Sequence, residues 1–177
     1  MMLRKVNFVV VLCLVFLCAT TADAQDQDHP ECYTLASLQG SYAIIGHYGD
    51  HLAIALTEGQ FDGKGNFKST FIVNEPDPTS ATGARKIVTG SQTGTYTINC
   101  DGTGVLARLV KLSNGETGTV VSDLIITKAV RSRPDTDGLL IGTALEDAQR
   151  TPSFIVPGGV FLTRTYTRLP DREEDSH

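Results

Sequence analysis

Hydrophobic and polar residues alternate with a period of two along most of the chain after residue 40. This period is typical of strands that bury one face. Glycine-containing turns such as DGKGN, CDGTG and NGE separate several of the alternating segments. The pattern predicts eight strands, at residues 41–47, 51–61, 67–74, 91–99, 105–112, 117–127, 138–145 and 158–168.

The sequence predicts an all-β protein, because no long amphipathic helix accompanies these strands. Only residues 37–40 and 146–150 hint at a helical turn, and residues 75–90 form the one long connecting loop. A single eight-stranded antiparallel up-and-down β-barrel is favoured, since hairpins in sequence order can close without exposed edges. A β-sandwich is the alternative. A barrel of this size either fills with side chains or holds one small ligand.

The N-terminal segment is typical of a signal peptide. A short basic stretch precedes an apolar run at residues 8–18, and small residues follow at Ala22 and Ala24. The apolar run of about 11 residues is shorter than the roughly 20 that span a bilayer. We therefore expect a signal peptide at residues 1–24, cleavage near Ala24, no membrane span, and a secreted or periplasmic protein.

Export would leave Cys32 and Cys100 as the two cysteines of the mature chain. In an oxidising compartment two cysteines most simply form one disulfide. A zinc site or a reactive thiol would need further ligands or a neighbouring base, and neither is visible in the sequence. A lipoprotein anchored through Cys18 is a further alternative, although Leu17 stands where a lipobox requires a small residue.

Composition and charge divide the chain and exclude one class of partner. We expect an N-terminal segment at residues 25–36 tethered by the disulfide, a barrel domain at 37–169, and a disordered acidic tail at 170–177. The formal net charge is −5 at pH 7. Because no basic stripe interleaves with aromatic residues, nucleic-acid binding is not expected. The sequence indicates no cofactor.

The segment GHYGDH, at residues 46–51, is the first candidate site. His47, Tyr48 and His51 lie between two predicted strands and would stand at one mouth of the barrel. In an extended segment the two histidines would be roughly 13 Å apart, which is too far to share a metal ion. No metal site is predicted; a ligand-gating loop and a plain polar hairpin loop both fit the sequence.

Charged residues inside predicted strands form the second group of candidates: Glu58, Arg108, Asp123 and Arg164. Each shares a strand face with apolar residues. If these faces point inward, the four residues would form a buried cluster with shifted pKa values, suited to general acid or base catalysis. If they pair as a structural network, or if the strand phase is reversed, they have no catalytic role. Whether the protein is an enzyme therefore stays open.

Three motifs, SLQGSYAIIG, GQFDGKGNF and GTYTINCDGTG, resemble those of small secreted bacterial proteins with a calycin-like barrel. These proteins are similar in fold to lipocalins and allene oxide cyclases and are mostly uncharacterised. The resemblance implies architecture and transfers no catalytic residues. Gly40-Ser41-Tyr42 also resembles the Gly-x-Trp start of the first lipocalin strand, over which a late arginine such as Arg164 or Arg168 would pack. The chain departs from that pattern in having no tryptophan.

Three functions fit these observations. The first is a secreted barrel that binds a small apolar molecule in its lumen, which predicts an apolar cavity of a few hundred Å³. The second is a cyclase or isomerase similar to allene oxide cyclase, which predicts a cavity with Glu58 or an arginine pointing into it. The third is a structural or surface-interaction protein with a filled barrel and an exposed apolar patch. The sequence names neither a ligand nor an oligomeric state.

Overall fold

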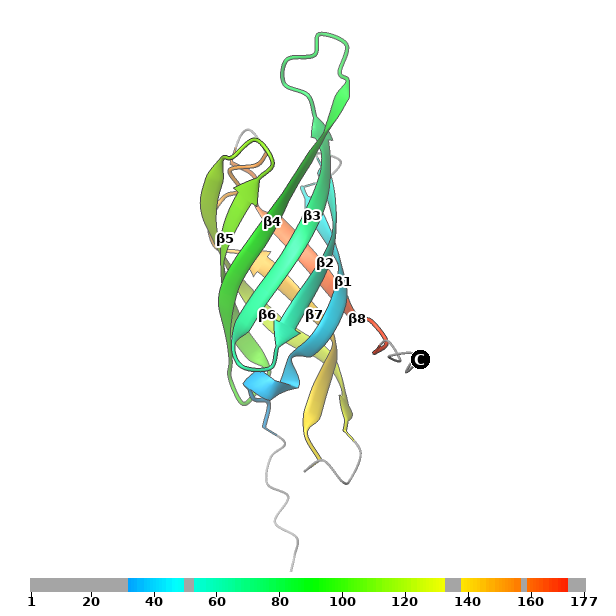
Figure 1. Ribbon diagram of the computed structural model, residues 1–177, viewed down its shortest axis with the longest axis vertical. Coiled ribbons are helices and arrows are strands. Elements are labelled where there is room, and N and C mark those ends of the chain that lie inside the picture. Colours follow the sequence, from blue (N-terminus) through cyan, green and yellow to red (C-terminus); the bar gives the residue numbers. More distant parts are fainter. Residues whose placement is uncertain (1–31, 50–52, 133–137, 157–158, 172–177) are drawn as a thin grey trace, which may run out of the picture.

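The chain forms a closed barrel of eight antiparallel strands, seen in a computed structural model that describes residues 32–49, 53–132, 138–156 and 159–171 (Figure 1). Each strand pairs with the next in sequence, and the last strand pairs with the first. The up-and-down barrel is therefore confirmed over the sandwich. The elements are η1 (Leu35–Ser37), β1 (Gln39–Tyr48), β2 (Ala53–Asp62), β3 (Asn66–Pro76), β4 (Arg85–Ile98), β5 (Thr103–Leu112), β6 (Thr117–Arg131), β7 (Leu140–Gln149) and β8 (Leu162–Arg168).

All eight predicted strands are present, and the differences lie at their ends. The predicted loop at 75–90 is shorter than expected, because β4 begins at Arg85 and pairs there with Pro76 on β3. These strands form a hairpin that projects beyond the upper end of the barrel (Figure 1). Residues 146–150, which hinted at a helical turn, belong to β7 as far as Gln149. Because β7 pairs with β6 and β8, this pairing overrides the weak local preference for a helical turn.

The strand register sets the mean tilt of the strands and with it the mean width of the barrel. The offset of the register is found by following the strand pairings once around the barrel. Starting at Tyr48 on β1 and passing through β8, β7 and the remaining strands, the pairings lead back to Leu38, ten residues earlier in the chain. With ordinary strand spacing, this displacement over eight strands gives a tilt of about 40°.

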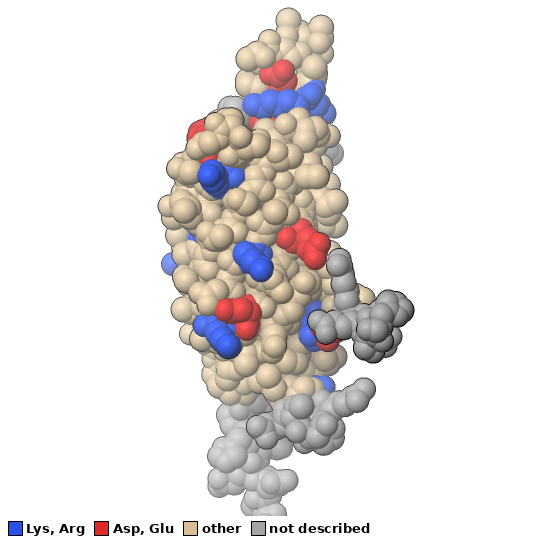
Figure 2. All heavy atoms as spheres, in the orientation of Figure 1, with Lys and Arg blue, Asp and Glu red and all other residues tan. Residues whose placement is uncertain are grey.

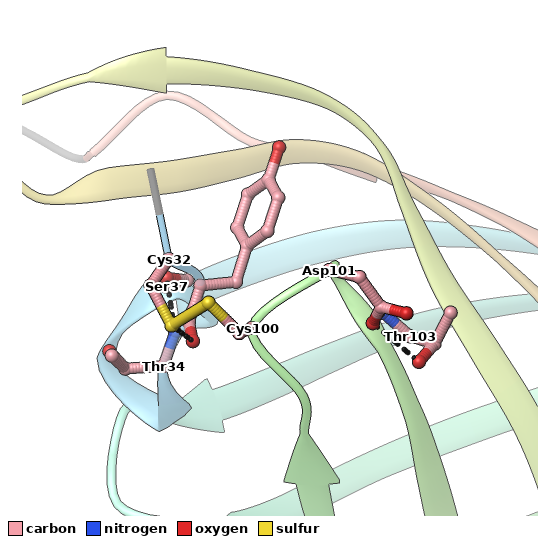
Figure 3. The surroundings of a disulfide bond; sticks show 7 residues. Cys32, Thr34, Ser37, Cys100, Asp101 and Thr103 are labelled. Carbon is pink, nitrogen blue, oxygen red and sulfur yellow. Dashed lines mark hydrogen bonds between the residues drawn. A yellow bond between two sulfur atoms is a disulfide. The ribbon is translucent and has the colours of Figure 1, made fainter. Parts of the chain in front are cut away.

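The N-terminal segment closes the lower end of the barrel. The 3₁₀-helix η1 lies there, and the hydroxyl of Tyr96 donates hydrogen bonds of 2.9 Å to the carbonyls of Leu35 and Leu38. A disulfide between Cys32 and Cys100 joins this segment to the turn between β4 and β5 (Figure 3). The predicted pairing of the cysteines is confirmed, and a disulfide indicates an oxidising, extracytoplasmic location.

The segment between β7 and β8 lies against the upper end. Ser153 and Val156 are buried, and the backbone N–H of Ser153 donates to the carbonyl of Val160 at 2.8 Å. The ring of Phe154 packs onto Gly118, where an added Cβ would come within 2.3 Å of the ring. A larger residue at position 118 would therefore displace this segment.

The interior holds two apolar clusters of different composition. The lower cluster is rich in aromatic residues and contains Leu38, Tyr42, Ile44, Phe61, Phe67, Tyr96, Leu106, Leu124, Ile126, Leu145 and Tyr166. The upper cluster has more small aliphatic residues and contains Tyr48, Ala53, Ala55, Phe71, Val73, Val110, Leu112, Val120, Val156 and Leu162. Within the described part of the chain, no helix is long and apolar enough to cross a membrane.

Candidate functional site: a polar belt inside the barrel

The four charged candidates fall into two pairs, one facing the barrel interior and one facing outward. Arg108 on β5 and Arg164 on β8 face the interior, with 1% and 8% of their surfaces exposed. Glu58 on β2 and Asp123 on β6 face outward and are exposed. The carboxylate of Asp123 accepts two hydrogen bonds from Arg150, at 2.5 and 2.9 Å, on the outer surface. The structure therefore brings the two arginines together and leaves the two acids outside.

The GHYGDH residues do not come together as a site. His47 is exposed on the outer face of β1, opposite Ile54. Tyr48 faces inward and is buried, and burial raises the pKa of its hydroxyl. His51 lies outside the described residues. Among the residues that are described, no group of three or more histidine, cysteine, aspartate or glutamate side chains could hold a metal ion.

A belt of polar side chains crosses the interior between the two apolar clusters. On each pair of adjacent strands from β3 to β8, the two members are either directly opposite each other or two residues away from being opposite. The members therefore lie side by side at one level of the barrel. The polar belt consists of Ser69 on β3, Gln92 on β4, Arg108 on β5, Ser122 on β6, Asp147 on β7 and Arg164 on β8; all six are buried. β1 contributes Gly46, opposite Arg164, at this level.

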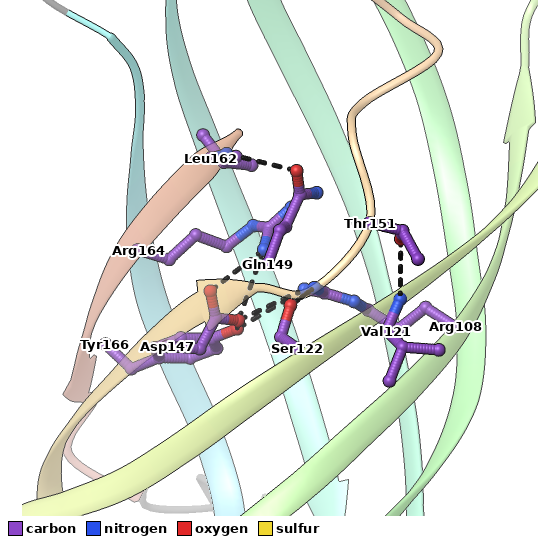
Figure 4. A network of polar contacts seen from close by, with 9 residues as sticks. All are labelled: Arg108, Val121, Ser122, Asp147, Gln149, Thr151, Leu162, Arg164 and Tyr166. Atoms are coloured by element: carbon purple, nitrogen blue, oxygen red, sulfur yellow. Dashed lines mark hydrogen bonds and ion pairs between the residues drawn. The ribbon is translucent and has the colours of Figure 1, made fainter. Parts of the chain in front are cut away.

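Asp147 is the centre of the hydrogen-bond network in this belt (Figure 4). Arg164 Nη1 donates to its two oxygens at 3.0 and 3.2 Å, and Arg108 Nη1 lies 3.4 Å from Oδ2. The hydroxyl of Tyr166 donates a short hydrogen bond to the same Oδ2. Arg108 Nη2 donates to Ser122 Oγ at 2.5 Å. One carboxylate thus serves two guanidinium groups and a phenol.

Burial sets the protonation of these groups. It is the main cause that raises the pKa of Tyr166, and the neighbouring charge of Asp147 raises it further. Burial also lowers the pKa of Arg108, and the positive charge of Arg164 adds to that effect. The phenol therefore stays protonated and works as a hydrogen-bond donor. The two cations repel each other in a site that water reaches poorly.

Several buried polar atoms have no hydrogen-bond partner in the described part of the protein. In the belt these are Ser69 Oγ, Gln92 Oε1 and Arg108 Nε. Nearer the upper end, both carboxylate oxygens of the buried Glu75 also lack one. The ammonium of Lys86 lies 3.1 Å from Glu75 Oε1, so the two form an ion pair without hydrogen-bond geometry. Glu75 is therefore compensated in charge.

The outer surface carries shallow hollows and an exposed aliphatic face. Four hollows of about 540 to 710 Å³ lie on the outside of the barrel; the largest is bordered by Glu58, Lys68 and the chain at 169–171. Figure 2 shows charged side chains of both signs scattered over the face formed by β2 to β5, with uncharged surface between them. The exposed aliphatic face consists of Ile45, Ile54, Leu56, Ile72 and Ile87 on β1 to β4.

Two members of the network, Asp147 and Tyr166, were not predicted from the sequence. Asp147 lies in the stretch that hinted at a helical turn, and Tyr166 lies two residues after Arg164 in the last predicted strand. The alternation of Leu145, Asp147 and Gln149 is the signal that could have placed Asp147 on an inward face. Of the two arginines expected near Tyr42, Arg168 is its direct cross-strand partner, and the Arg168 guanidinium approaches Gly40.

Comparison with known proteins adds no relative to this description. Neither a family model, nor a curated protein sequence, nor a solved structure matches the chain. What the residues themselves establish is a closed, disulfide-linked, eight-stranded antiparallel β-barrel with a buried polar belt.

Proposed function

We propose that this protein binds a small molecule inside the barrel, in the upper half between the polar belt and the segment that joins β7 to β8. The observation that carries the proposal is the set of buried polar atoms without partners, on Ser69, Glu75, Gln92 and Arg108. Buried polar groups in native proteins nearly always have a partner. A bound molecule, together with ordered water, supplies the partners that the chain does not.

The composition of the upper cluster supports this placement. Alanine and valine occupy inward positions there, such as Ala53, Ala55 and Val73, whereas aromatic rings occupy the equivalent space below. Smaller side chains fill less of a barrel interior and so leave more of it to a ligand. The hydrogen-bonding atoms favour an amphipathic ligand over the purely apolar one that strand alternation alone suggests.

We also infer that the protein is secreted after cleavage near Ala24 and belongs with the calycin-like barrels. The disulfide and the sequential eight-stranded closure support both inferences. An enzyme similar to allene oxide cyclase is the catalytic form of the same proposal. The inward Arg108 and Arg164 favour it, whereas the outward Glu58 does not.

The experiment is native mass spectrometry of the mature protein purified from its own source, followed by denaturation and extraction. We expect a small molecule to be released. Val73→Phe should fill the upper interior and abolish its binding, whereas Ile72→Phe, on the outward face of the same strand, should retain it. Ala55→Val is a milder filling variant in case Val73→Phe does not fold. A protein that carries nothing and binds no apolar dye contradicts the proposal.

A second candidate function rests on the exposed aliphatic face. Ile45, Leu56 and Ile72 are direct neighbours across β1, β2 and β3, and Leu56 is 62% exposed. Glu58 and Lys68 lie outward beside this face with opposite charges, so two copies could pair these residues across a two-fold axis. A filled barrel would then work as a homodimer. Concentration-dependent sedimentation that Leu56→Glu abolishes would support this candidate; a monomer at all concentrations would contradict it.

A further inference from the structure

The polar belt contains more positive than negative charge. Arg108 and Arg164 both face it, and Asp147 is the one carboxylate that contacts them. Glu75, the other described carboxylate in the interior, forms its ion pair with Lys86. The belt therefore holds one uncompensated positive charge in surroundings where an unpaired charge is costly.

The excess charge lies mainly on Arg108. Asp147 lies closer to Arg164, which donates to both carboxylate oxygens, whereas its single contact with Arg108 is 3.4 Å long. Arg108 is 1% exposed, and its Nε has no partner among the described residues. A buried guanidinium with an unused N–H favours a further acceptor with negative charge.

The other two unpartnered belt atoms lie on the strands next to this guanidinium. Ser69 and Gln92 are directly opposite each other on β3 and β4, and Gln92 is a diagonal neighbour of Arg108 across β4 and β5. The hydroxyl of Ser69 and the Nε of Arg108 can each donate a hydrogen bond to an oxygen ligand. The unpartnered atom of Gln92 is its carbonyl oxygen Oε1, an acceptor, so its amide has to turn Nε2 toward the ligand to become a third donor.

We propose that the polar belt binds the carboxylate of an amphipathic acid, whose apolar part lies against the upper cluster. This inference rests on the proposed function, because it names the ligand class of the same interior site. The carboxylate neutralises the excess charge beside Arg108, and the alanine and valine side chains above the belt surround the hydrocarbon. A small free anion shares the head-group chemistry, so the experiment must separate the two sources.

Calorimetric titration of the delipidated mature protein makes this separation with three probes: sodium decanoate, decanol and sodium acetate. We expect decanoate to bind about 10- to 100-fold more tightly than decanol, the range that one charged hydrogen bond provides. Acetate should bind far more weakly than decanoate, since it lacks the apolar chain. Equal binding of decanoate and decanol overturns the inference and leaves the proposed function standing.

Two variants locate the head group. Gln92→Leu removes one side of the proposed site without touching the network around Asp147, and it should weaken decanoate about tenfold while decanol is unchanged. Thr93→Leu, at the next and outward position of β4, is its matched control and should change neither probe. Arg108→Met should abolish the preference for decanoate, provided that its circular dichroism matches that of the unaltered protein.

The remaining outcomes also decide the question. Acetate binding as tightly as decanoate would show that the belt accepts a small anion alone and would overturn the amphipathic acid. Decanoate binding that both Gln92→Leu and Arg108→Met leave unchanged would place the head group elsewhere and overturn the belt as its site. If no probe binds, and native mass spectrometry also finds no molecule, the inference and the proposed function fail together.

Discussion

The two halves of the barrel interior are built from different side chains under the same backbone geometry. In the lower half the ring of Phe61 lies within 5.3 Å, centroid to centroid, of the rings of Tyr42, Phe67 and Tyr96. The upper half places alanines and valines at corresponding positions. The proposed function assigns stability to the lower half and ligand binding to the upper half.

The two ends of the barrel are closed by different kinds of contact. The lower end is held by the disulfide and by hydrogen bonds from Tyr96 to the chain beside η1. The upper end is covered by the segment between β7 and β8, which contacts the barrel through the ring of Phe154 on Gly118 and through a hydrogen bond of 3.4 Å from the backbone N–H of Val121 to Thr151 Oγ1. The polar belt is the boundary between the two halves.

The largest effect should come from removing the carboxylate at that boundary. Asp147→Ala leaves two buried guanidinium groups without an anion, which typically costs about 3–5 kcal/mol of unfolding free energy. We expect a loss near the upper end of that range in urea denaturation, because Tyr166 loses its acceptor as well. Asp147→Asn, which keeps the shape, should lose less. A loss below 1 kcal/mol for Asp147→Ala would mean that the belt is solvated and that the halves are not separated by it.

Two matched Phe→Ala substitutions test whether the lower half of the interior is packed more tightly than the upper half. Phe61→Ala in the lower half and Phe71→Ala in the upper half remove the same group, at a typical cost of about 3–5 kcal/mol. We expect Phe61→Ala to cost about 1 kcal/mol more, because its cavity opens among packed rings. Urea denaturation of the ligand-free protein gives both values. Equal losses would show that the upper half is packed as well as the lower one.

Alkaline pH should lower the stability of the protein through Tyr42 of the lower cluster. Burial raises the pKa of Tyr42 to about 12, from an ordinary value of 10.0. The folded protein therefore holds this proton more tightly than the unfolded chain does. The stabilising contribution is complete below pH 10 and is lost as the pH rises through about 12.

Tyr42→Phe is the variant that isolates this effect. At neutral pH it should cost about 1 kcal/mol, since it removes the hydrogen bond of 2.6 Å to the carbonyl of Gly142. Its stability should then fall less steeply between pH 10 and 12 than that of the unaltered protein. Urea denaturation across this pH range, with tyrosinate absorbance as the protonation readout, provides the measurement. Parallel pH profiles would show that Tyr42 ionises as an exposed tyrosine does.

The smallest effect should come from the outer surface. Asp123→Asn breaks an exposed ion pair with Arg150, and exposed pairs contribute little to stability because water and salt screen them. Thermal denaturation should show a shift of a few degrees at most, and ligand binding should not change. A large loss of stability or of binding would contradict the outward phase of β6.

The orientation of β2 is a feature that the sequence alone could not predict. On β2 both faces are apolar: Ile54 and Leu56 alternate with Ala53 and Ala55. Size alone suggests that the larger residues face inward, but the structure exposes them and buries the alanines. Interior space is limited by the whole barrel, including the rings that other strands contribute. The phase of one strand is therefore a property of the closed barrel.

The sequence by itself determined the number of strands, their order and the fold class, because alternation and glycine turns act over a few residues. It also predicted the disulfide, since removal of the expected signal peptide would leave Cys32 and Cys100 with one simple pairing. The tertiary structure decided which faces point inward and which charges meet. Arg108, Asp147 and Arg164 lie 39 and 17 residues apart in sequence. They meet because the register and closure of the barrel bring β5, β7 and β8 to one level.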